Sequence, residues 1–550
     1  MVRRQMIPSL TALLALTAPA LLAPALSAQG YHQDPVKAMK SQIDSTLNGF
    51  AKAPPSTPEN AAKFLIAAVR SPRHYDLADG PFMRVPLETL RKAQRNTGLY
   101  GKGQPNQVRM TSAWAYQALS ELDKTRFAED LTALRAAFAK EFGLEGAKLD
   151  QALHPYSALH YASLLDSSNM ADVVLTQVAQ YELLLQKIAR EAKARPWEAF
   201  QQKGVDFLLG AQKDGKWLVP GGPGGAMVPD PGISALCLSA LSSKPEKERT
   251  EQEKAVIGKG VKFLLSVQQE DGSFSNYLPN YYTCTAVMAL TRASVPGTAE
   301  ALRKAQRYLL SIQNAEKNGF VPSDRDYGSI GYGGDRRGDV SNTQMALDAL
   351  RATGLPAQHS AIEKALIFLR RSQNLPGKGS FKGTRRTEDG RKVPVTAGTD
   401  GGATYYPGNS SFGYDETSDG AQVARSYGSM TYALLKCYIL ADLPKEDPRL
   451  QAALNWCFTN YTLEENPGAK KSANKKIRYQ GLYYYYLALA RALSLGGIDK
   501  VQGKDWRSDL RKKLQAEQNP DGSWTNKKNS RWWENNPLIV TAYALLALSE

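Results

Sequence analysis

The sequence predicts an all-α protein whose helical hairpins repeat and close into a ring. Five segments between residues 204 and 524 share one pattern: an amphipathic helix, a Gln, and a polar turn with Gly that ends on an aromatic residue. A more apolar helix follows each of them, as in residues 231–243 and 281–293. Such a unit cannot bury its apolar face alone, so neighbouring units must stack.

Each part of the repeat has a physical role. The first helix carries Lys, Arg and Glu on one face, so we expect it outside, while the second is apolar nearly all round and should lie inside. The Gln can satisfy unpaired backbone groups of the adjoining turn. The aromatic residue can then clamp that turn onto the next hairpin. The Gln residues are 212, 268, 313, 373 and 518, and the aromatic residues are Trp217, Phe274, Phe320, Phe381 and Trp524.

The number of hairpins favours a closed ring. A degenerate first helix at 447–468 precedes an apolar helix at 479–493, which brings the total to six pairs between 196 and 550. A seventh pair, ending at 112–122, is possible upstream. Hairpin arrays can stay open as solenoids or close into rings, and six pairs with wholly apolar inner helices favour closure.

This repeat resembles that of the squalene-hopene cyclase and protein prenyltransferase β-subunit superfamily. The resemblance covers residues 196–550, about two-thirds of the chain. It implies an all-α, α/α toroid with inner and outer rings of helices and six to seven hairpins. Fold alone does not assign chemistry, because unrelated functions share such scaffolds.

The acid motif of the cyclases is only partly matched. The resemblance implies an Asp-x-Asp-Asp motif at the start of an inner helix, whose central carboxyl protonates a double bond. Here Asp339 takes the first place, Ser341 stands at the proton donor and Asn342 replaces the last Asp. A Ser hydroxyl is far too weak an acid for this step. Asp339 and Asn342 can instead cap the helix.

Metal chemistry has little support in the sequence. The prenyltransferases bind zinc through Asp, Cys and His, but Cys284 here lacks an Asp-x-Cys context and Tyr282 stands where a His would suit. No two of the five His residues are spaced i,i+4. We therefore expect no metal and no cofactor. The cysteines have apolar neighbours and are expected to be buried thiols, with a 437–457 disulfide as the alternative; they are Cys237, Cys284, Cys437 and Cys457.

Other acids and aromatic residues give a second set of candidates. Asp415, Glu416 and Asp419 gather before an inner helix, where they are either acid catalysts together with Asp339 or parts of a capped, solvated loop. Tyr rings suit an isoprenoid or a sugar, although they also pack cores. Of four consecutive Tyr at 483–486, at most two can reach one cavity. The expected ligand-cavity residues are Tyr282, Asn342, Arg425, Tyr427, Tyr432 and Tyr484.

The remaining features concern domains and partners. Residues 1–28 have the layout of a bacterial signal peptide, residues 29–59 that of a linker, and residues 60–195 form a helical region that can supply the first toroid hairpin. We expect export to the periplasm or outside the cell and no membrane segment once the signal is removed. The net charge of +16 suits contact with an anionic envelope surface, and no nucleic-acid-binding module accompanies it. The Gly- and Lys-rich loop at 378–411 is a candidate lid.

Three functions remain open at this point. The first is an exported toroid that binds a hydrophobic small molecule, an isoprenoid or lipid, with a degraded acid motif. The second is an active terpenoid cyclase, transferase or isomerase that uses a different acid. The third is an envelope polysaccharide lyase, hydrolase or glycan-binding protein, because α/α toroids also host such enzymes.

Overall fold

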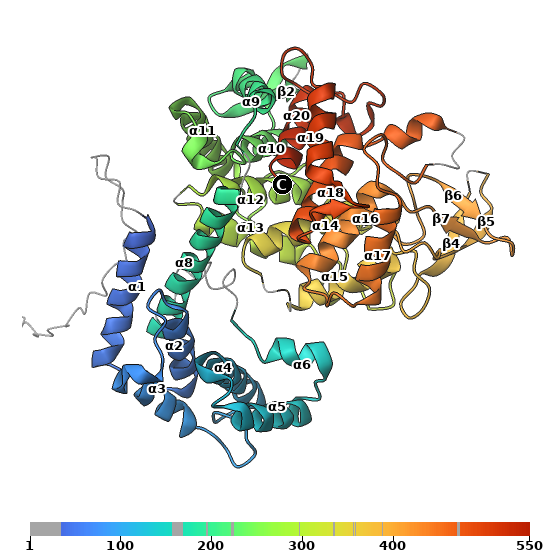
Figure 1. Cartoon of the computed structure of the whole chain (residues 1–550). Coiled ribbons are helices and arrows are strands. Elements are labelled where there is room, and N and C mark those ends of the chain that lie inside the picture. Colours follow the sequence, from blue (N-terminus) through green and yellow to red (C-terminus); the bar gives the residue numbers. More distant parts are fainter. Residues whose placement is uncertain are drawn as a thin grey trace, which may run out of the picture.

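The computed structural model describes residues 35–156, 169–193, 196–221, 225–295, 297–333, 336–355, 357, 359–387, 389–469 and 474–550. The expected signal peptide at 1–28 lies outside these residues. Two separate hydrophobic cores organise the chain, one formed by residues 43–181 and the other by residues 200–548. The protein therefore has an N-terminal helical unit and a toroid (Figure 1).

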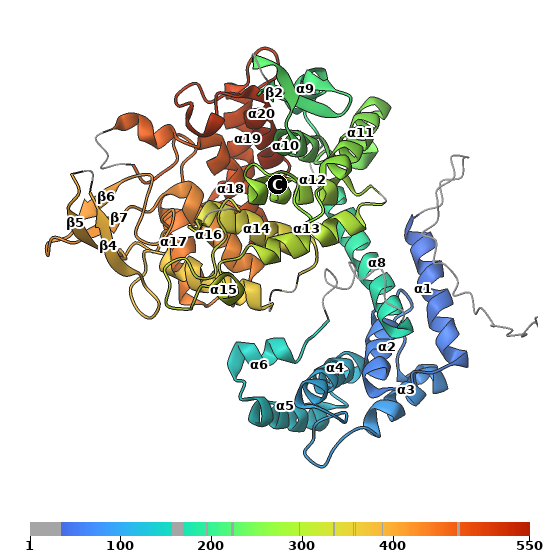
Figure 2. The ribbon, with the colours of Figure 1, turned by 180° about the vertical axis from the view of Figure 1, so that it is seen from behind.

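The inner helices of the toroid form a closed ring. Each contacts the next in chain order, and the last returns to the first. Figure 2 shows the ring from behind. The inner helices are buried on nearly every face, as their apolar sequences predict. They are α10 (Pro231–Leu241), α12 (Pro279–Ala293), α14 (Val340–Ala352), α16 (Gly428–Leu440), α18 (Leu482–Leu495) and α20 (Pro537–Leu548).

The outer helices alternate with the inner ones along the chain. Each packs on an inner helix and exposes its charged face, so the predicted α/α toroid with six hairpins is confirmed. The outer helices are α9 (Ala199–Ala211), α11 (Glu251–Val267), α13 (Ala299–Ser311), α15 (Ser360–Arg371), α17 (Pro448–Thr459) and α19 (Trp506–Glu517).

The repeated Gln joins successive hairpins. The Gln313 amide donates to the Gly328 carbonyl in its own turn, at 2.9 Å, and to the Ala361 carbonyl in α15, at 2.8 Å. Gln268 and Gln373 make the same two bonds to their own turn and the next outer helix. Gln518 donates to Phe200 in α9 and so fastens the last hairpin to the first. The predicted role of Gln in satisfying the turn is confirmed at these positions.

Two of the five predicted aromatic clamps are wrong. The clamp residue is the one whose backbone N–H donates to a hydroxyl of the next inner helix. Trp217, Phe274 and Trp524 fulfil this condition, but Ile330 and Ala403 take the place of Phe320 and Phe381. In these two repeats many residues are inserted between the Gln and the turn, so the first aromatic residue after the Gln lies in the insertion.

Short strands fill the loops of the toroid. The candidate lid at 378–411 contains two strands of a four-stranded sheet, ordered β4-β5-β7-β6, in which β5 and β7 are parallel. The strands are β1 (Gln212–Lys213), β2 (Lys216–Pro220), β3 (Met227–Pro229), β4 (Lys382–Arg386), β5 (Lys392–Thr396), β6 (Tyr414–Glu416), β7 (Gln422–Ala424), β8 (Lys500–Val501) and β9 (Lys504–Asp505).

The N-terminal unit corrects two expectations. Residues 35–52 of the expected linker form a helix, because Ile43 and Leu47 face the core of this unit and are fully buried. The possible seventh hairpin packs in that same core rather than joining the ring. The helices are α1 (Pro35–Lys52), α2 (Pro58–Arg70), α3 (Pro81–Arg91), α4 (Pro105–Asp123), α5 (Ala128–Phe142), α6 (Gly146–Ala152) and α8 (Met170–Lys193).

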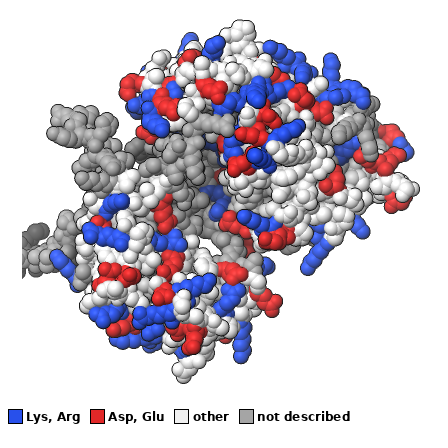
Figure 3. All heavy atoms as spheres, viewed as in Figure 1, with Lys and Arg blue, Asp and Glu red and all other residues white. Residues whose placement is uncertain are grey.

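Surface charge does not form a single track on the face shown. Figure 3 shows Lys and Arg interspersed with Asp and Glu over both units. None of the helices in the described part of the chain is long and apolar enough to cross a membrane.

Candidate functional site

A large cavity of about 280 Å³ occupies one end of the ring, where the inner helices begin. It is lined by the first residues of these helices and by loops that precede them. Eleven of its lining residues are aromatic. Among the described residues that line it, none is Lys, Arg or His. The aromatic residues are Tyr277, Tyr281, Tyr282, Tyr332, Tyr405, Phe412, Tyr427, Tyr484, Trp532, Trp533 and Tyr543.

The segment that resembles the cyclase motif lies at this cavity. Ser341 and Asn342 line it, while Asp339 lies behind them and is fully buried. One Asp339 oxygen accepts the Asn342 backbone N–H at 2.8 Å, and the other accepts the Asn342 side-chain amide at 2.9 Å. Burial raises the pKa of Asp339 to about 6 against the effect of these donors. Asp339 therefore acts as the N-cap of α14.

Tyrosine hydroxyls form the floor of the cavity. The Ser341 and Tyr484 hydroxyls lie 2.9 Å apart, and the Gln344 amide donates to Tyr484 at 3.0 Å. Tyr281 and Tyr543 are joined hydroxyl to hydroxyl at 3.0 Å. The Ser341 side chain is thus an alcohol within a hydroxyl network.

The expected site residues divide into two groups. Tyr282, Asn342, Tyr427 and Tyr484 line the large cavity. Of the four consecutive Tyr, Tyr484 alone does so, and the Tyr483, Tyr485 and Tyr486 hydroxyls bond to Glu517, Thr462 and Leu463 respectively. This agrees with the predicted maximum of two, because successive helical positions point about 100° apart.

The second acidic cluster lies away from the cavity. Asp415 and Glu416 belong to β6, Asp419 lies in the following turn, and none lines the cavity. Arg425 pairs with Asp415 at 2.8 Å, which matches the alternative of a salt-bridged loop. Tyr432 packs against Tyr485 and donates to the Cys457 carbonyl, so it is a core residue. The acidic cluster and Arg425 lie outside the cavity because they belong to the sheet insertion, whereas Tyr432 lies in α16 and points into the core.

Sequence reasoning missed two carboxyl groups that do line the cavity. Asp230 caps α10 through the Ile233 N–H and accepts the Tyr282 hydroxyl at 2.5 Å. Glu534 is fully buried and accepts three backbone N–H groups at the start of α18. The Asn526 amide is its fourth donor, at 2.7 Å. Asp230 stands before Pro231 in a cap pattern, which the sequence could have revealed.

Four hydrogen bonds leave Glu534 little capacity for catalysis. Each carboxylate oxygen has two lone pairs, and each oxygen of Glu534 accepts two donors. Burial raises its pKa to about 7. The group therefore fixes the loop before α20 to the N-terminus of α18, where burial disfavours its charged form despite the four donors and the helix dipole.

An aromatic pair stands at the edge of the cavity. Trp532 and Trp533 are both about half exposed, and both have positive φ values of 64° and 60°. Bulky residues rarely adopt this conformation, and such strain concentrates at functional sites. Tyr277, 63% exposed, also lines the cavity. No repeat pattern predicted these rings, because they lie in loops between hairpins.

The cysteines are free and buried at all four positions, and 437 and 457 are not bridged. Burial raises the pKa of the Cys284 thiol. Within the described residues, no group of three or more His, Cys, Asp or Glu side chains could hold a metal ion.

Comparison with known proteins finds a similarity over part of the toroid. Residues 223–390 match the model of the squalene-hopene cyclase C-terminal domain. This part of the toroid is similar to the squalene-hopene cyclase-like superfamily. The squalene-hopene cyclase of Bradyrhizobium diazoefficiens is 26% identical over 230 residues, which are 37% of this chain and 33% of that protein. That of Zymomonas mobilis is 29% identical over 202 residues, 33% of this chain and 30% of that protein.

The chain thus spans about a third of the length of these curated cyclases. Among solved structures, the apo type II terpene cyclase MstE from Scytonema is similar at 15% identity and a TM-score of 0.38, covering 64% of this chain and 96% of that one. The ent-copalyl diphosphate synthase of Streptomyces platensis is similar at 14% identity and a TM-score of 0.28, covering 84% and 100%. Similarities at this level do not indicate which reaction, if any, this protein performs.

Proposed function

We propose that this protein is a non-cyclising toroid that binds an apolar, isoprenoid-type molecule in the large cavity. The observation that carries the proposal is the wall of the cavity, where eleven aromatic residues meet Leu236, Ile233, Met430 and Ile539. Aromatic rings offer rigid apolar surface, which suits a hydrocarbon chain.

The carboxyl groups near the cavity support binding without cyclisation. Protonation of an alkene needs an acidic carboxyl with a free O–H aimed at the ligand. Asp339 is turned away into its helix cap, and every lone pair of Glu534 is occupied. Asp230 is likewise held by Ile233 and Tyr282. Ser341, which stands where the resembling motif has its proton donor, is an alcohol and too weak an acid to protonate an alkene.

Binding can be tested with farnesol as the probe. We expect farnesol to change the fluorescence of Trp532 and Trp533 saturably, and mass spectrometry of extracts to recover it unchanged. Ile233→Trp fills the cavity and should abolish the response, whereas Val321→Trp, at a half-exposed position outside the lining, should not. Cyclised product would select the active enzyme. Absence of farnesol binding together with binding of an acidic glycan would replace the proposal by the polysaccharide alternative.

We also propose export to the periplasm or beyond. The charged start and apolar middle of residues 1–28 support it. Cell fractionation of the full chain tests it, and a cytosolic protein that retains this segment would contradict it.

A further inference from the structure

Two cavities share the hollow of the ring. The large cavity lies at the first turns of the inner helices, and a small cavity of about 90 Å³ lies further along the same helices. Among the described residues, four line both cavities and therefore stand between them: Leu236, Tyr281, Tyr484 and Tyr543. The three tyrosines of this set are called the tyrosine floor.

Hydrogen bonds of the tyrosine floor span the ring between helices that are not neighbours. Tyr281 of α12 and Tyr543 of α20 are joined hydroxyl to hydroxyl at 3.0 Å, although α10 lies between these helices in the ring. Tyr484 of α18 bonds in the same way to Ser341 of α14, at 2.9 Å, with α16 between them. The rings of Tyr484 and Tyr543 are in contact, with centroids 6.0 Å apart. The floor thus crosses the hollow from both sides.

The Tyr484 hydroxyl marks the boundary between the cavities. Of its two hydrogen-bond partners, Ser341 lines the large cavity and Gln344 lines the small one. Moving the floor aside would break these bonds and the Tyr281–Tyr543 bond inside the protein, where an unpaired hydroxyl is costly. The floor is therefore held in place across the path from one cavity to the other.

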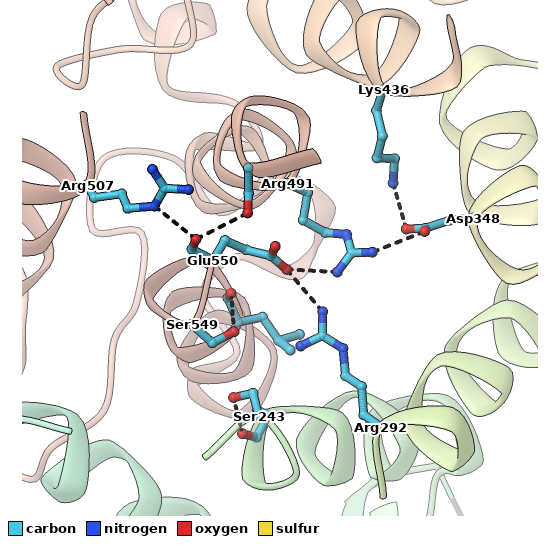
Figure 4. A network of polar contacts seen from close by, with 11 residues as sticks. Ser243, Arg292, Asp348, Lys436, Arg491, Arg507, Ser549 and Glu550 are labelled. Carbon is cyan, nitrogen blue, oxygen red and sulfur yellow. Dashed lines mark hydrogen bonds and ion pairs between the residues drawn. The ribbon is translucent and has the colours of Figure 1, made fainter. Parts of the chain in front are cut away.

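The charged residues around the small cavity are engaged with one another (Figure 4). Lys436 and Arg491 bind the two oxygens of Asp348, at 2.8 and 3.0 Å. Arg491 and Arg292 bind Glu550, at 2.8 and 3.0 Å. The surface that this cavity offers to a ligand is almost wholly apolar. Its apolar lining residues are Leu236, Met288, Met345, Leu487, Ala488 and Leu546.

The small cavity has room for a short apolar group. A water-sized group needs about 10–15 Å³ of such volume, so 90 Å³ holds about six to nine of them. This is enough for one isoprene unit and not for two. An apolar cavity of this kind stays empty of water and accepts apolar guests.

We propose that the tyrosine floor sets the length of the apolar chain that the protein binds. The chain enters at the exposed edge of the large cavity, beside Trp532 and Trp533, and its end stops against the three tyrosine rings. The small cavity behind them becomes available only when the floor is opened. This inference deepens the proposed function and rests on it for the class of ligand.

Linear 1-alkanols of increasing length measure the depth of the large cavity directly. Each methylene that becomes buried strengthens binding about fourfold. We expect the dissociation constant, followed by the fluorescence of Trp532 and Trp533, to fall by this factor with each carbon until the chain reaches the floor. Beyond this cut-off length it should stay constant. A dissociation constant that keeps falling through the longest soluble alkanol would overturn the proposal.

Variants that open the floor should move the cut-off length. Tyr484→Ala should raise it by about five carbons, the size of one isoprene unit. Tyr281→Ala should do the same, and it replaces Tyr484→Ala if that protein does not fold. Tyr427→Ala is the matched control, because it removes an equal ring that lines the large cavity alone. An unchanged cut-off in a folded floor variant, or an equal rise in Tyr427→Ala, would contradict the proposal.

Filling the small cavity tests whether a chain already enters it. Met288 lines the small cavity and not the large one, so Met288→Trp fills the space behind the floor. Alone, this change should leave the cut-off length where it is. Combined with Tyr484→Ala, it should cancel the rise. A shorter cut-off in Met288→Trp alone would mean that the chain passes the floor in the unaltered protein, and the proposal would be wrong.

Farnesol and geranylgeraniol, which differ by one isoprene unit, connect the length limit to the proposed function. We expect Tyr484→Ala to shift the ratio of their dissociation constants at least tenfold in favour of geranylgeraniol. If neither isoprenoid binds while the alkanol cut-off moves as expected, the proposed function fails and the length limit stands. If both bind and neither the ratio nor the cut-off moves, the length limit fails and the proposed function stands. If no chain of either kind binds, both fail.

Discussion

If the ring is closed, the hydrogen bonds of Gln518 should contribute measurably to the free energy of unfolding. Its amide donates to the Phe200 carbonyl at 2.7 Å and to the Gly522 carbonyl at 2.8 Å, joining α19 to α9. Gln518→Met keeps the side-chain length but removes both donors. A lost hydrogen bond contributes about 0.5–1.5 kcal/mol, and a buried carbonyl left unsatisfied costs about 1–3 kcal/mol. We therefore expect the free energy of unfolding to fall by about 2–4 kcal/mol.

The matched control is Gln268→Met at the joint between α11 and α13. Gln268 is half-buried like Gln518 and makes the equivalent bonds, at 3.1 and 2.8 Å. Urea unfolding followed by tryptophan fluorescence reports mainly on the toroid, which contains seven of the eight Trp. In a closed ring the two variants lose similar stability. A Gln518→Met protein as stable as the unaltered chain, beside a weakened Gln268→Met protein, would refute closure at this joint.

Three further predictions concern the interior. Gly328 has φ +86°, and a Cβ there would collide with the Lys364 carbonyl. Gly390 has a similar φ of +83° but open space around it, so it is the control. In thermal unfolding, Gly328→Ala should be less stable than Gly390→Ala by about 1–3 kcal/mol. The pKa of Glu534 is raised from 4.5 to about 7 in the folded protein, so its contribution to the free energy of unfolding is complete below pH 4.5 and is lost as the pH rises through 7. In urea unfolding, the stability of the unaltered protein relative to Glu534→Gln should therefore fall by about 3 kcal/mol across this range. A stability difference that does not change with pH would contradict this prediction. Asp348→Asn leaves Lys436 buried without its partner and should cost about 3–5 kcal/mol in urea unfolding, much of which Asp348→Asn/Lys436→Met should restore.

The sequence predicts the ring because its signal is repeated. Gln at the end of each outer helix and apolar residues all round each inner helix fix how hairpins stack, and these determine the fold. Phe320 and Phe381 show the limit of the pattern. A long insertion between the Gln and the turn displaces the nearest aromatic residue, and the true clamp positions hold Ile330 and Ala403, which carry no aromatic signal.

The candidate site was predictable only where it lies on the repeat. Tyr282, Asn342 and Tyr484 lie in the first turns of inner helices and Tyr427 directly precedes one, so the register of the hairpins directs all four to one cavity. Asp415 and Arg425 lie in a strand insertion whose path no periodicity describes. Glu534 reaches the cavity through a tertiary contact with the start of α18, which local sequence does not encode.

The central claim is that six hairpins close around a hollow. Spin labels on Lys203→Cys of α9 and Asp521→Cys after α19 test it directly, because both positions are exposed and Gly522 packs against the Lys203 backbone. Neighbouring helices lie about 8–10 Å apart. A closed ring therefore predicts that the two spin labels are separated by one such interhelical distance plus the length of the labels. A distance of several steps, about 40–50 Å or more, would mean an open array and would contradict the account.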